Sequence, residues 1–237
     1  MKINMNPNSE LVQSVVQVPD LVQVPDQLIS MAHQFQEAMM MYTCAIREVK
    51  TKLEVLNDEL SVRNQRNPIE MIKSRVKKPV SIVEKLYRKG MPISIESMVN
   101  NLDDIAGIRV ICSFLDDIYQ VAAMLTKQDD IKVLAVKDYI KNPKPNGYRS
   151  YHMIIEIPVF FSDEKRQMRV EVQIRTIAMD FWASLDHQLK YKKELIKAAE
   201  ISEELRQCAE IIAQTDEKML AIRQNIESQG IEIKNDY

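Results

Sequence analysis

Acidic side chains stand at two positions from which they could hold a metal ion beside a phosphate group. The segment from Arg166 to Arg175 alternates apolar and polar residues, which predicts a strand whose polar face carries Arg169, Glu171, Gln173 and Arg175. Asp104 lies shortly before an apolar, β-rich segment, Ile108 to Phe114, which predicts a buried strand. If these strands are neighbours, Asp104 and Glu171 form a two-carboxylate site for Mg²⁺, an ion that fills its other positions with phosphate oxygens and water.

Each of these features also has a purely structural interpretation. The polar face of a hairpin strand is commonly solvated. The run from Asp103 to Arg109, with Gly107 inside it, is also compatible with an acidic helix end and a turn into a strand. Two carboxylates near basic segments nevertheless favour chemistry on a metal-bound phosphate over acid–base hydrolysis of a sugar.

Two segments are strongly basic, although the net charge of the chain is −2. Residues 63–90 hold nine Lys or Arg against two Glu, and residues 132–149 hold five basic residues against one Asp. The near-neutral total argues against a protein whose whole surface coats nucleic acid. Two local basic segments indicate a local anionic ligand instead.

The first basic segment contains a predicted helix that begins at Pro79. Ser81, Lys85 and Arg88 share one face of it, and Arg75 and Lys77 come just before it. A solvated basic helix, a nucleic-acid patch and a polyphosphate site at a helix N-terminus all fit this pattern. No G-x-x-x-x-G-K-[ST] motif occurs, so a nucleotide would have to bind without a P-loop.

The elements that must position these residues follow from periodicity and turn chemistry. Helical spacing predicts a long amphipathic helix from Gln27, and Asn67 with Pro68 predicts the start of a short helix. The remaining predicted helices are 79–90, a short one from Ser94, 116–127, 177–192 and 202–228, and the remaining strands are 131–136 and 151–161, with a loop at 141–147. This order predicts an α/β or α+β fold, a mixed β-sheet flanked by helices, with long helical ends.

Length and composition fix the class of protein. The 237 residues suffice for one domain or slightly more, and we expect a flexible N-terminal extension over 1–26, a main domain over 27–192 and a C-terminal helical segment over 193–237. Three cysteines without metal-ligand spacing exclude a disulfide scaffold and structural zinc. Because no long apolar run and no signal peptide are apparent, we expect a cytoplasmic protein with no membrane partner.

Three motifs resemble the synthetase domain of the RelA/SpoT family, and more narrowly the small alarmone synthetases. They are the run from Lys144 to His152, the run Val170-Glu-Val-Gln-Ile-Arg-Thr176, and the run Ala178-Met-Asp-Phe-Trp-Ala183. The resemblance covers about Asn67 to Lys192 and implies a nucleotidyltransferase-like fold. It implies a transferase of the stringent response, a GTP pyrophosphokinase that moves pyrophosphate from ATP to the ribose 3′-hydroxyl of GDP or GTP. The products are ppGpp or pppGpp and AMP.

The resemblance also assigns roles to residues at matching positions. Asp104 and Glu171 would be catalytic and would hold Mg²⁺, with Glu171 also taking the proton from the 3′-hydroxyl. The residues implied to bind ATP are Arg75, Lys77, Ser81, Lys85, Arg88 and Arg109. Those implied to bind GDP or GTP are Lys137, Lys144, Asn146, Tyr148, His152 and Gln173, with Tyr148 stacking on guanine. Asp186 stands where the family often has Glu, and Lys137 where an arginine is common, whereas His187 is interpreted as structural.

Other functions remain compatible with the sequence. A toxin with the same fold could pyrophosphorylate the 3′ end of tRNA, and a non-enzymatic regulator could bind RNA through the basic segment. A helical oligomerisation module would explain the long terminal helices, and small family members are typically homotetramers. The apolar stripe of the last helix, which includes Leu205, Ile212 and Met219, is accordingly expected to pack between subunits. The three histidines are followed by Gln, Met and Gln, so the His-Asp pair of a metal-dependent hydrolase is absent and we expect no alarmone hydrolysis.

Overall fold

The computed structural model of the protein describes residues 26–64, 66–190 and 198–229. The expected N-terminal extension therefore lies outside the described residues, except for Asp26, where the first helix begins. The elements are α1 (Asp26–Asn64), β1 (Ile69–Val76), α2 (Pro79–Arg88), α3 (Ile95–Asn101), β2 (Ala106–Cys112), α4 (Leu115–Thr126), β3 (Lys132–Asp138), β4 (Tyr151–Phe160), β5 (Lys165–Thr176), α5 (Ile177–Lys190) and α6 (Ala198–Ser228).

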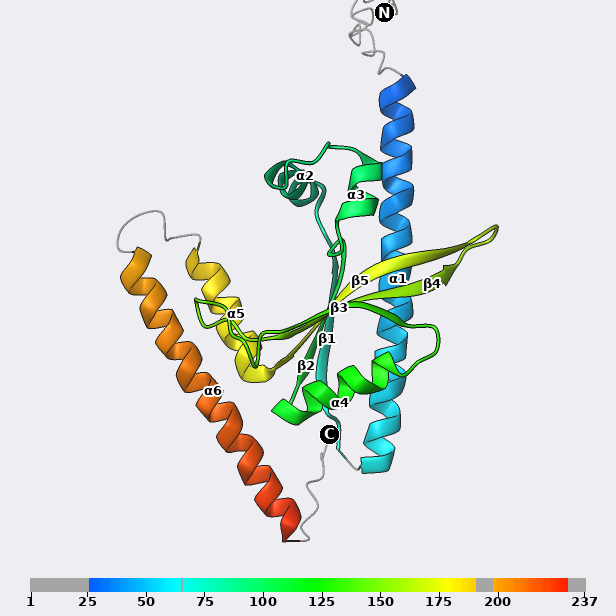
Figure 1. Cartoon of the computed structure of the whole chain (residues 1–237). Helices are drawn as coiled ribbons and strands as arrows, with labels where there is room; N and C mark the ends of the chain where they lie inside the picture. Colours follow the sequence, from blue (N-terminus) through cyan, green and yellow to red (C-terminus); the bar gives the residue numbers. More distant parts are fainter. Residues whose placement is uncertain (1–25, 65, 191–197, 230–237) are drawn as a thin grey trace, which may run out of the picture.

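Five strands form one mixed sheet in the order β1-β2-β5-β4-β3 (Figure 1). Only the central pair, β2 and β5, is parallel, and Gly107 lies opposite Glu171 in its register. The other pairs are antiparallel, including the hairpin of β4 and β5. The prediction of a mixed sheet flanked by helices is confirmed, and so is the neighbourhood of the two strands near the predicted carboxylates.

The two faces of the sheet differ in chemistry because each strand of the centre alternates strictly. The face that carries Val170, Val172 and Ile174 is fully buried and belongs to one core cluster together with side chains of α1 and α4. The opposite face, called the polar face below, carries Arg109, Glu171, Gln173 and Arg175 together with His152 of β4. A one-residue shift of β5 would exchange these faces, so burial of the valines fixes where the polar side chains point.

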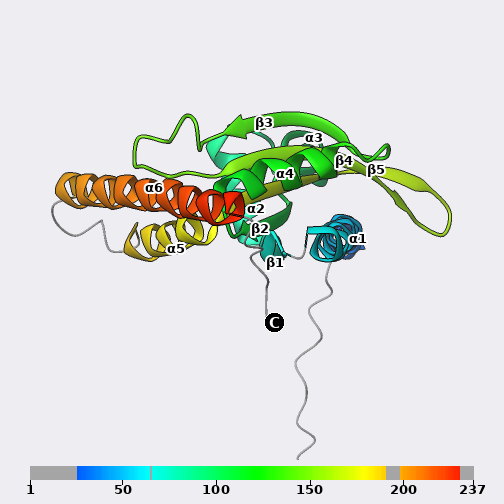
Figure 2. The ribbon, with the colours of Figure 1, turned by 90° about the horizontal axis from the view of Figure 1, so that it is seen from below.

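Helix α1 confirms the predicted amphipathic helix. Its buried residues follow steps of three and four, among them Tyr42, Val49, Leu53 and Leu60. The helix runs along the sheet on the opposite side of the molecule from α5 and α6 (Figure 2). Burial raises the pKa of the Tyr42 hydroxyl to about 12, so it stays protonated in the core.

The helix predicted after Asn67 is wrong, because this segment is strand β1. Ile69 is buried and Ile72 is half-buried against the core cluster, and the strand pairs with β2 along its length. A Pro after an Asn resembles a helix start locally, but the hydrogen-bonding groups of the β2 edge outweigh that preference. The helix that does begin with Pro is α2, and it ends before Gly90, whose φ is +66°.

The C-terminal helix packs on its own chain. Trp182 of α5 forms a small cluster with Leu205 and Ala209 of α6, and its indole N–H donates to the backbone oxygen of Leu205 at 2.8 Å. Ile212 also packs against this cluster, whereas Met219 remains half exposed. Part of the stripe expected between subunits is thus covered within the subunit. No helix in the described part of the chain is long and apolar enough to cross a membrane.

An ionic cluster fixes the other end of α6 to α4. Asp117, fully buried, accepts a hydrogen bond from Arg66 at 2.8 Å and another from the backbone N–H of Phe114 at 3.1 Å. Arg223 of α6 lies 3.7 Å from the same carboxylate and pairs with Asp116. Both guanidinium groups lie over the Phe114 ring, at 5.4 Å for Arg66 and 4.7 Å for Arg223.

Candidate active site

A cavity of about 720 Å³ lies on the polar face of the sheet, where β2, β4 and β5 meet the loop before β4 and helix α5. Ten of the fourteen predicted site residues line it: Arg75, Asp104, Arg109, Lys137, Lys144, Asn146, Tyr148, His152, Glu171 and Gln173. A second cavity of about 300 Å³ shares Arg75, Arg109 and Glu171 with it and extends over β1 and β2. Glu171 thus borders both cavities. It lies between the end that extends over β1 and β2, called the β1–β2 end below, and the end formed by β4 and the loop before it, called the β4-loop end.

Asp104 is held by two lysines. Lys77 Nζ lies 3.0 Å and Lys85 Nζ 2.7 Å from the same oxygen, Oδ2, and the backbone N–H of Lys77 donates to Ile105 at 2.8 Å. Burial raises the pKa of the Asp104 carboxyl, but the two lysines outweigh it, and the net pKa lies below its ordinary value. Asp104 is therefore an anion at neutral pH, in a pocket of positive charge.

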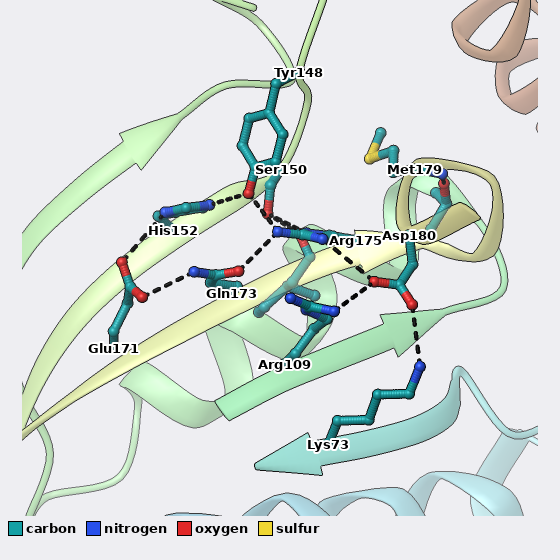
Figure 3. A network of polar contacts seen from close by, with 12 residues as sticks. Lys73, Arg109, Tyr148, Ser150, His152, Glu171, Gln173, Arg175, Met179 and Asp180 are labelled. Atoms are coloured by element: carbon teal, nitrogen blue, oxygen red, sulfur yellow. Dashed lines mark hydrogen bonds and ion pairs between the residues drawn. The ribbon is translucent and has the colours of Figure 1, made fainter. Parts of the chain in front are cut away.

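Glu171 is the second carboxylate at the centre of the cavity. It accepts a hydrogen bond from the Gln173 amide at 2.8 Å, and Nδ1 of His152 lies 3.6 Å from its other oxygen (Figure 3). Burial raises the pKa of Glu171. The His152 ring and the Gln173 amide lower this pKa by more than burial raises it, so the net pKa is below the ordinary value. The nearby charge of Asp104 acts in the opposite direction and raises the pKa of Glu171.

The two carboxylates fit the donor set of a magnesium ion. The Oδ1 atom of Asp104 is buried and has no hydrogen-bond partner within the described residues, which is costly unless a ligand or an ion satisfies it. No group of three or more His, Cys, Asp or Glu side chains in the described ranges could hold a metal alone. Two carboxylates and open positions suit an ion that shares its coordination with phosphate oxygens and water.

The far wall of the cavity is aromatic and basic. Tyr139, Tyr148 and His152 contact each other edge to face, with ring centroids 5.1 to 6.1 Å apart. Lys144 Nζ lies 4.7 Å from the centres of both tyrosine rings. Gly147, with φ of +86°, makes the turn that brings Tyr148 to this wall. A flat ring beside a cation suits an aromatic base attached to an anionic group.

Arg175 ties this wall to the sheet and was not among the predicted site residues. It is 3% exposed, lines the cavity, and donates to Ser150 at 3.2 Å, to Gln173 at 2.8 Å and to the Tyr148 hydroxyl (Figure 3). Because Arg can only donate, the Tyr148 hydroxyl accepts from it and can donate its own proton to Nε2 of His152, 2.9 Å away. Burial lowers the pKa of His152, which favours the neutral ring that this bond needs. Alternation placed Arg175 on the polar face, but nothing in the sequence signalled its burial.

Four predicted residues do not line the cavity. Lys77 and Lys85 act at its edge through Asp104. Ser81 is half-buried and Arg88 is exposed on α2, and neither has a described side-chain contact at the site. A Cβ atom placed on Gly107 would have atoms of Arg75 as its nearest neighbours, at 3.7 Å or more, so the backbone of Gly107 is not crowded.

Helix α5 adds cavity residues that were not among the predicted site residues. Asp186 is 4% exposed and accepts from the Asn146 amide at 3.4 Å, and His187 and Gln188 line the cavity beside it. His187, interpreted from the sequence as structural, is exposed at the cavity wall. Tyr139 and Ile154 were also missed. The helical period of α5 alone did not show which side faces the sheet.

The chain is similar in sequence and in structure to known proteins. Residues 74–195 match a family model described as a region found in RelA and SpoT proteins. GTP pyrophosphokinase YwaC of Bacillus subtilis is 44% identical over 202 residues, 85% of this chain and 96% of that protein. The small alarmone synthetase 1 of the same organism superimposes with a TM-score of 0.76 when bound to its product pppGpp and 0.70 when bound to AMPCPP. These two structures are 35% and 33% identical, covering 82% and 83% of this chain and 99% of each solved chain.

Proposed function

The chain belongs to the RelA/SpoT family and is a small alarmone synthetase, a GTP pyrophosphokinase, and on that premise we propose how its cavity makes (p)ppGpp. The observation that carries the proposal is the pair of carboxylates beside one cavity: Asp104, just before β2 and held by Lys77 and Lys85, and Glu171 of the neighbouring strand β5. In the reaction the 3′-oxygen of GDP or GTP forms a bond to the β-phosphorus of ATP. The bond from that phosphorus to the α-phosphate oxygen breaks, and AMP leaves.

Asp104 and Glu171 would hold Mg²⁺, which supplies charge neutralisation on the ATP phosphates when bound. Lys77 and Lys85 already surround Asp104, and we infer that they also contact phosphate oxygens. Transfer of this kind depends mainly on in-line positioning and on stabilising charge, so fixed cations at the reacting phosphate are the main contribution expected of the chain.

Glu171 is also placed to accept the proton of the 3′-hydroxyl. Its lowered pKa keeps it ionised, and it borders both cavities at the junction between their ends. The Gln173 amide and the His152 ring fix the carboxylate, which reduces the rearrangement needed when the hydroxyl arrives.

We assign the β1–β2 end of the cavity to ATP. Arg75 and Arg109 project from neighbouring strands there, and the Nε atom of Arg109 is buried without a hydrogen-bond partner within the described residues. Flat guanidinium groups can lie against adenine on either side. Ser81 and Arg88 on α2 remain predicted ATP contacts, which α2 would have to bring closer to the phosphates.

We assign the β4-loop end to GDP or GTP. Tyr148 offers its ring to guanine, and the basic residues Lys137 and Lys144 line the same end for phosphates. Asn146 and His152 complete this wall with polar groups. Base stacking on an aromatic ring is worth about 1–3 kcal/mol in nucleic-acid sites.

The direct test is incubation of the protein with γ-labelled ATP, Mg²⁺ and one of GDP, GTP or tRNA. We expect label in a guanosine tetra- or pentaphosphate, release of AMP, and no product after chelation of Mg²⁺. Label in tRNA instead would identify a tRNA-directed toxin, and binding of RNA without turnover would favour the RNA-binding regulator. Glu171→Gln is the control that separates this enzyme from a contaminant.

We also propose a homo-oligomer, with a tetramer as the expected size. Helix α5 presents an apolar stripe at steps of four that is exposed in the single chain: Ile177 at 53%, Phe181 at 60%, Leu185 at 39% and Leu189 at 42%. A contiguous apolar stripe of this kind is typical of a surface that another chain covers.

A further inference from the structure

One carboxylate, that of Asp180, lies between three cations of the polar face. Its Oδ1 atom accepts from Nη1 of Arg109 at 3.1 Å and from Nη1 of Arg175 at 3.3 Å, and its Oδ2 atom lies 3.3 Å from Nζ of Lys73 (Figure 3). Asp180 is 8% exposed, so its contacts with the two arginines are largely shielded from water, whereas the side chain of Lys73 is 51% exposed. The three cations come from three adjacent strands, and the carboxylate comes from α5.

The position of Asp180 is fixed by the start of its helix. Thr176, the last residue of β5, accepts a hydrogen bond from the backbone N–H of Met179 at 3.1 Å through its hydroxyl oxygen. The same hydroxyl donates to Asp216 of α6 at 2.7 Å, and both Thr176 and Asp216 are buried. A capped first turn held from both sides leaves the Asp180 carboxylate little freedom to move.

Arg109 and Arg175 repel each other, since the charge of Arg109 is one cause that lowers the pKa of Arg175, although burial is the largest. A carboxylate oxygen shared by both guanidinium groups removes this conflict and makes their positions interdependent. Arg175 in turn holds the Tyr148 hydroxyl and the Gln173 amide oxygen, while Arg109 lines the opposite end of the cavity. A continuous chain of contacts therefore joins the two ends through Asp180.

We propose that Asp180 is a positioning residue that couples the two nucleotide subsites, by holding Arg109 on the ATP side and Arg175, with Tyr148, on the GDP side. The assignment of the sides rests on the proposed function. Because the Asp180 carboxylate is fixed and shares one oxygen between the two guanidinium groups, a contact of ATP with Arg109 changes the hydrogen bond left to Arg175, and through it the position of the guanine wall before GDP binds. Each nucleotide should therefore raise the affinity for the other by the same factor.

The experiment measures the dissociation constant of AMPCPP with and without saturating GDP, by calorimetry. In the wild-type protein we expect GDP to tighten AMPCPP binding by about fivefold or more. In Asp180→Asn, which keeps the shape but not the charge, the factor should fall to about one. Lys73→Ala is the matched control, because it removes the exposed ion pair of Asp180 and leaves both arginine contacts in place.

The outcomes are separable. If Asp180 has only a structural role, Asp180→Asn should lower the melting temperature and weaken the binding of both nucleotides, but GDP should still tighten AMPCPP binding by the wild-type factor. That result would overturn the proposal. An unchanged factor in a stable Asp180→Asn protein, or loss of coupling in Lys73→Ala as well, would also overturn it. If the wild-type protein makes the guanosine product yet shows no coupling, only this inference is wrong. If it makes no product from ATP and GDP, the proposed function itself is wrong and the inference falls with it.

Discussion

Gly147 and Ala209 touch at a distance that only a glycine allows: a Cβ atom on Gly147 would lie 2.5 Å from the Cβ of Ala209 and 3.3 Å from the Cα of Arg206. Ala209 lies on α6, more than sixty residues along the chain from the turn that presents Tyr148. The neighbouring Arg149 pairs with Glu210 of α6 at 3.5 Å. The C-terminal helix therefore supports the aromatic wall of the cavity from behind.

Gly147→Ala should weaken both stability and the acceptor site. Holding a residue that has a Cβ in the left-handed conformation costs about 1–2 kcal/mol of folding free energy. In addition, the clash with Ala209 should push the turn and Tyr148 away from α6. Gly90→Ala is the matched control, because its φ is also positive but nothing lies within 4 Å of its Cβ. Urea denaturation should show a loss for both variants, and only Gly147→Ala should raise the KM for GDP. Equal KM values in the two variants would show that α6 does not support the wall.

The sequence predicted the parts of this site that depend on local pattern. Alternation in β5 placed Glu171 and Gln173 on one face, and turn residues placed a loop before Tyr148. It could not reveal that Arg175 is buried, since a charged residue on a polar face looks the same whether solvated or enclosed. The contact between Gly147 and Ala209 is equally invisible, because it depends on packing between segments far apart in the chain. Strand β1 was mistaken for a helix because its pairing partner, not its own residues, decides its structure.

Glu171→Gln should retain the fold and nucleotide binding but lose nearly all synthesis. The amide neither takes the 3′-hydroxyl proton nor offers the charge that Mg²⁺ needs, and general base catalysis alone contributes about 10²–10⁴-fold. Initial rates of AMP release at saturating nucleotides measure the loss, and thermal unfolding checks the fold. Glu164→Gln, in the hairpin turn far from the cavity, is the control and should be normal. Turnover near the wild-type rate in Glu171→Gln would contradict the assignment of this residue.

Tyr148→Ala and Tyr148→Phe separate the two roles of this side chain. Removing the ring should raise the KM for GDP by about 5- to 150-fold, the range that corresponds to stacking worth about 1–3 kcal/mol. Removing only the hydroxyl frees Arg175 and His152 but keeps the stacking surface, so the increase should be smaller. The KM for ATP should change little in both variants. A rise in the ATP requirement with an unchanged GDP requirement would show that Tyr148 belongs to the other subsite.

Phe181→Glu should reduce the size of the oligomer. Phe181 is the most exposed member of the α5 stripe, and a carboxylate there cannot be buried against a second chain without a large desolvation cost. Light scattering coupled to size exclusion should report the wild-type protein as an oligomer and the variant as a smaller species. Phe160→Glu, which replaces a 73% exposed phenylalanine near the hairpin turn, is the control and should keep the wild-type size. A wild-type monomer at working concentration would contradict the proposed assembly.

Asp117→Asn should destabilise the protein more than an Asp-to-Asn substitution at an exposed position. Asp117 is fully buried and neutralises Arg66 and Arg223, whose side chains are only 14% and 6% exposed. The amide keeps the shape but leaves the nearly buried guanidinium group of Arg66 without its ion-pair partner, whereas Arg223 keeps Asp116. Breaking a buried pair in this way costs about 3–5 kcal/mol.

Asp116→Asn removes the neighbouring carboxylate, which also pairs with Arg223 but is 47% exposed, and it should cost below about 1 kcal/mol. Urea unfolding at neutral pH gives both free energies. Because the cluster joins α4, α6 and the segment before β1 at a distance from the cavity, Asp117→Asn protein that remains folded should keep the wild-type KM for both nucleotides. Equal losses of stability in the two variants would show that burial of Asp117 does not determine its contribution.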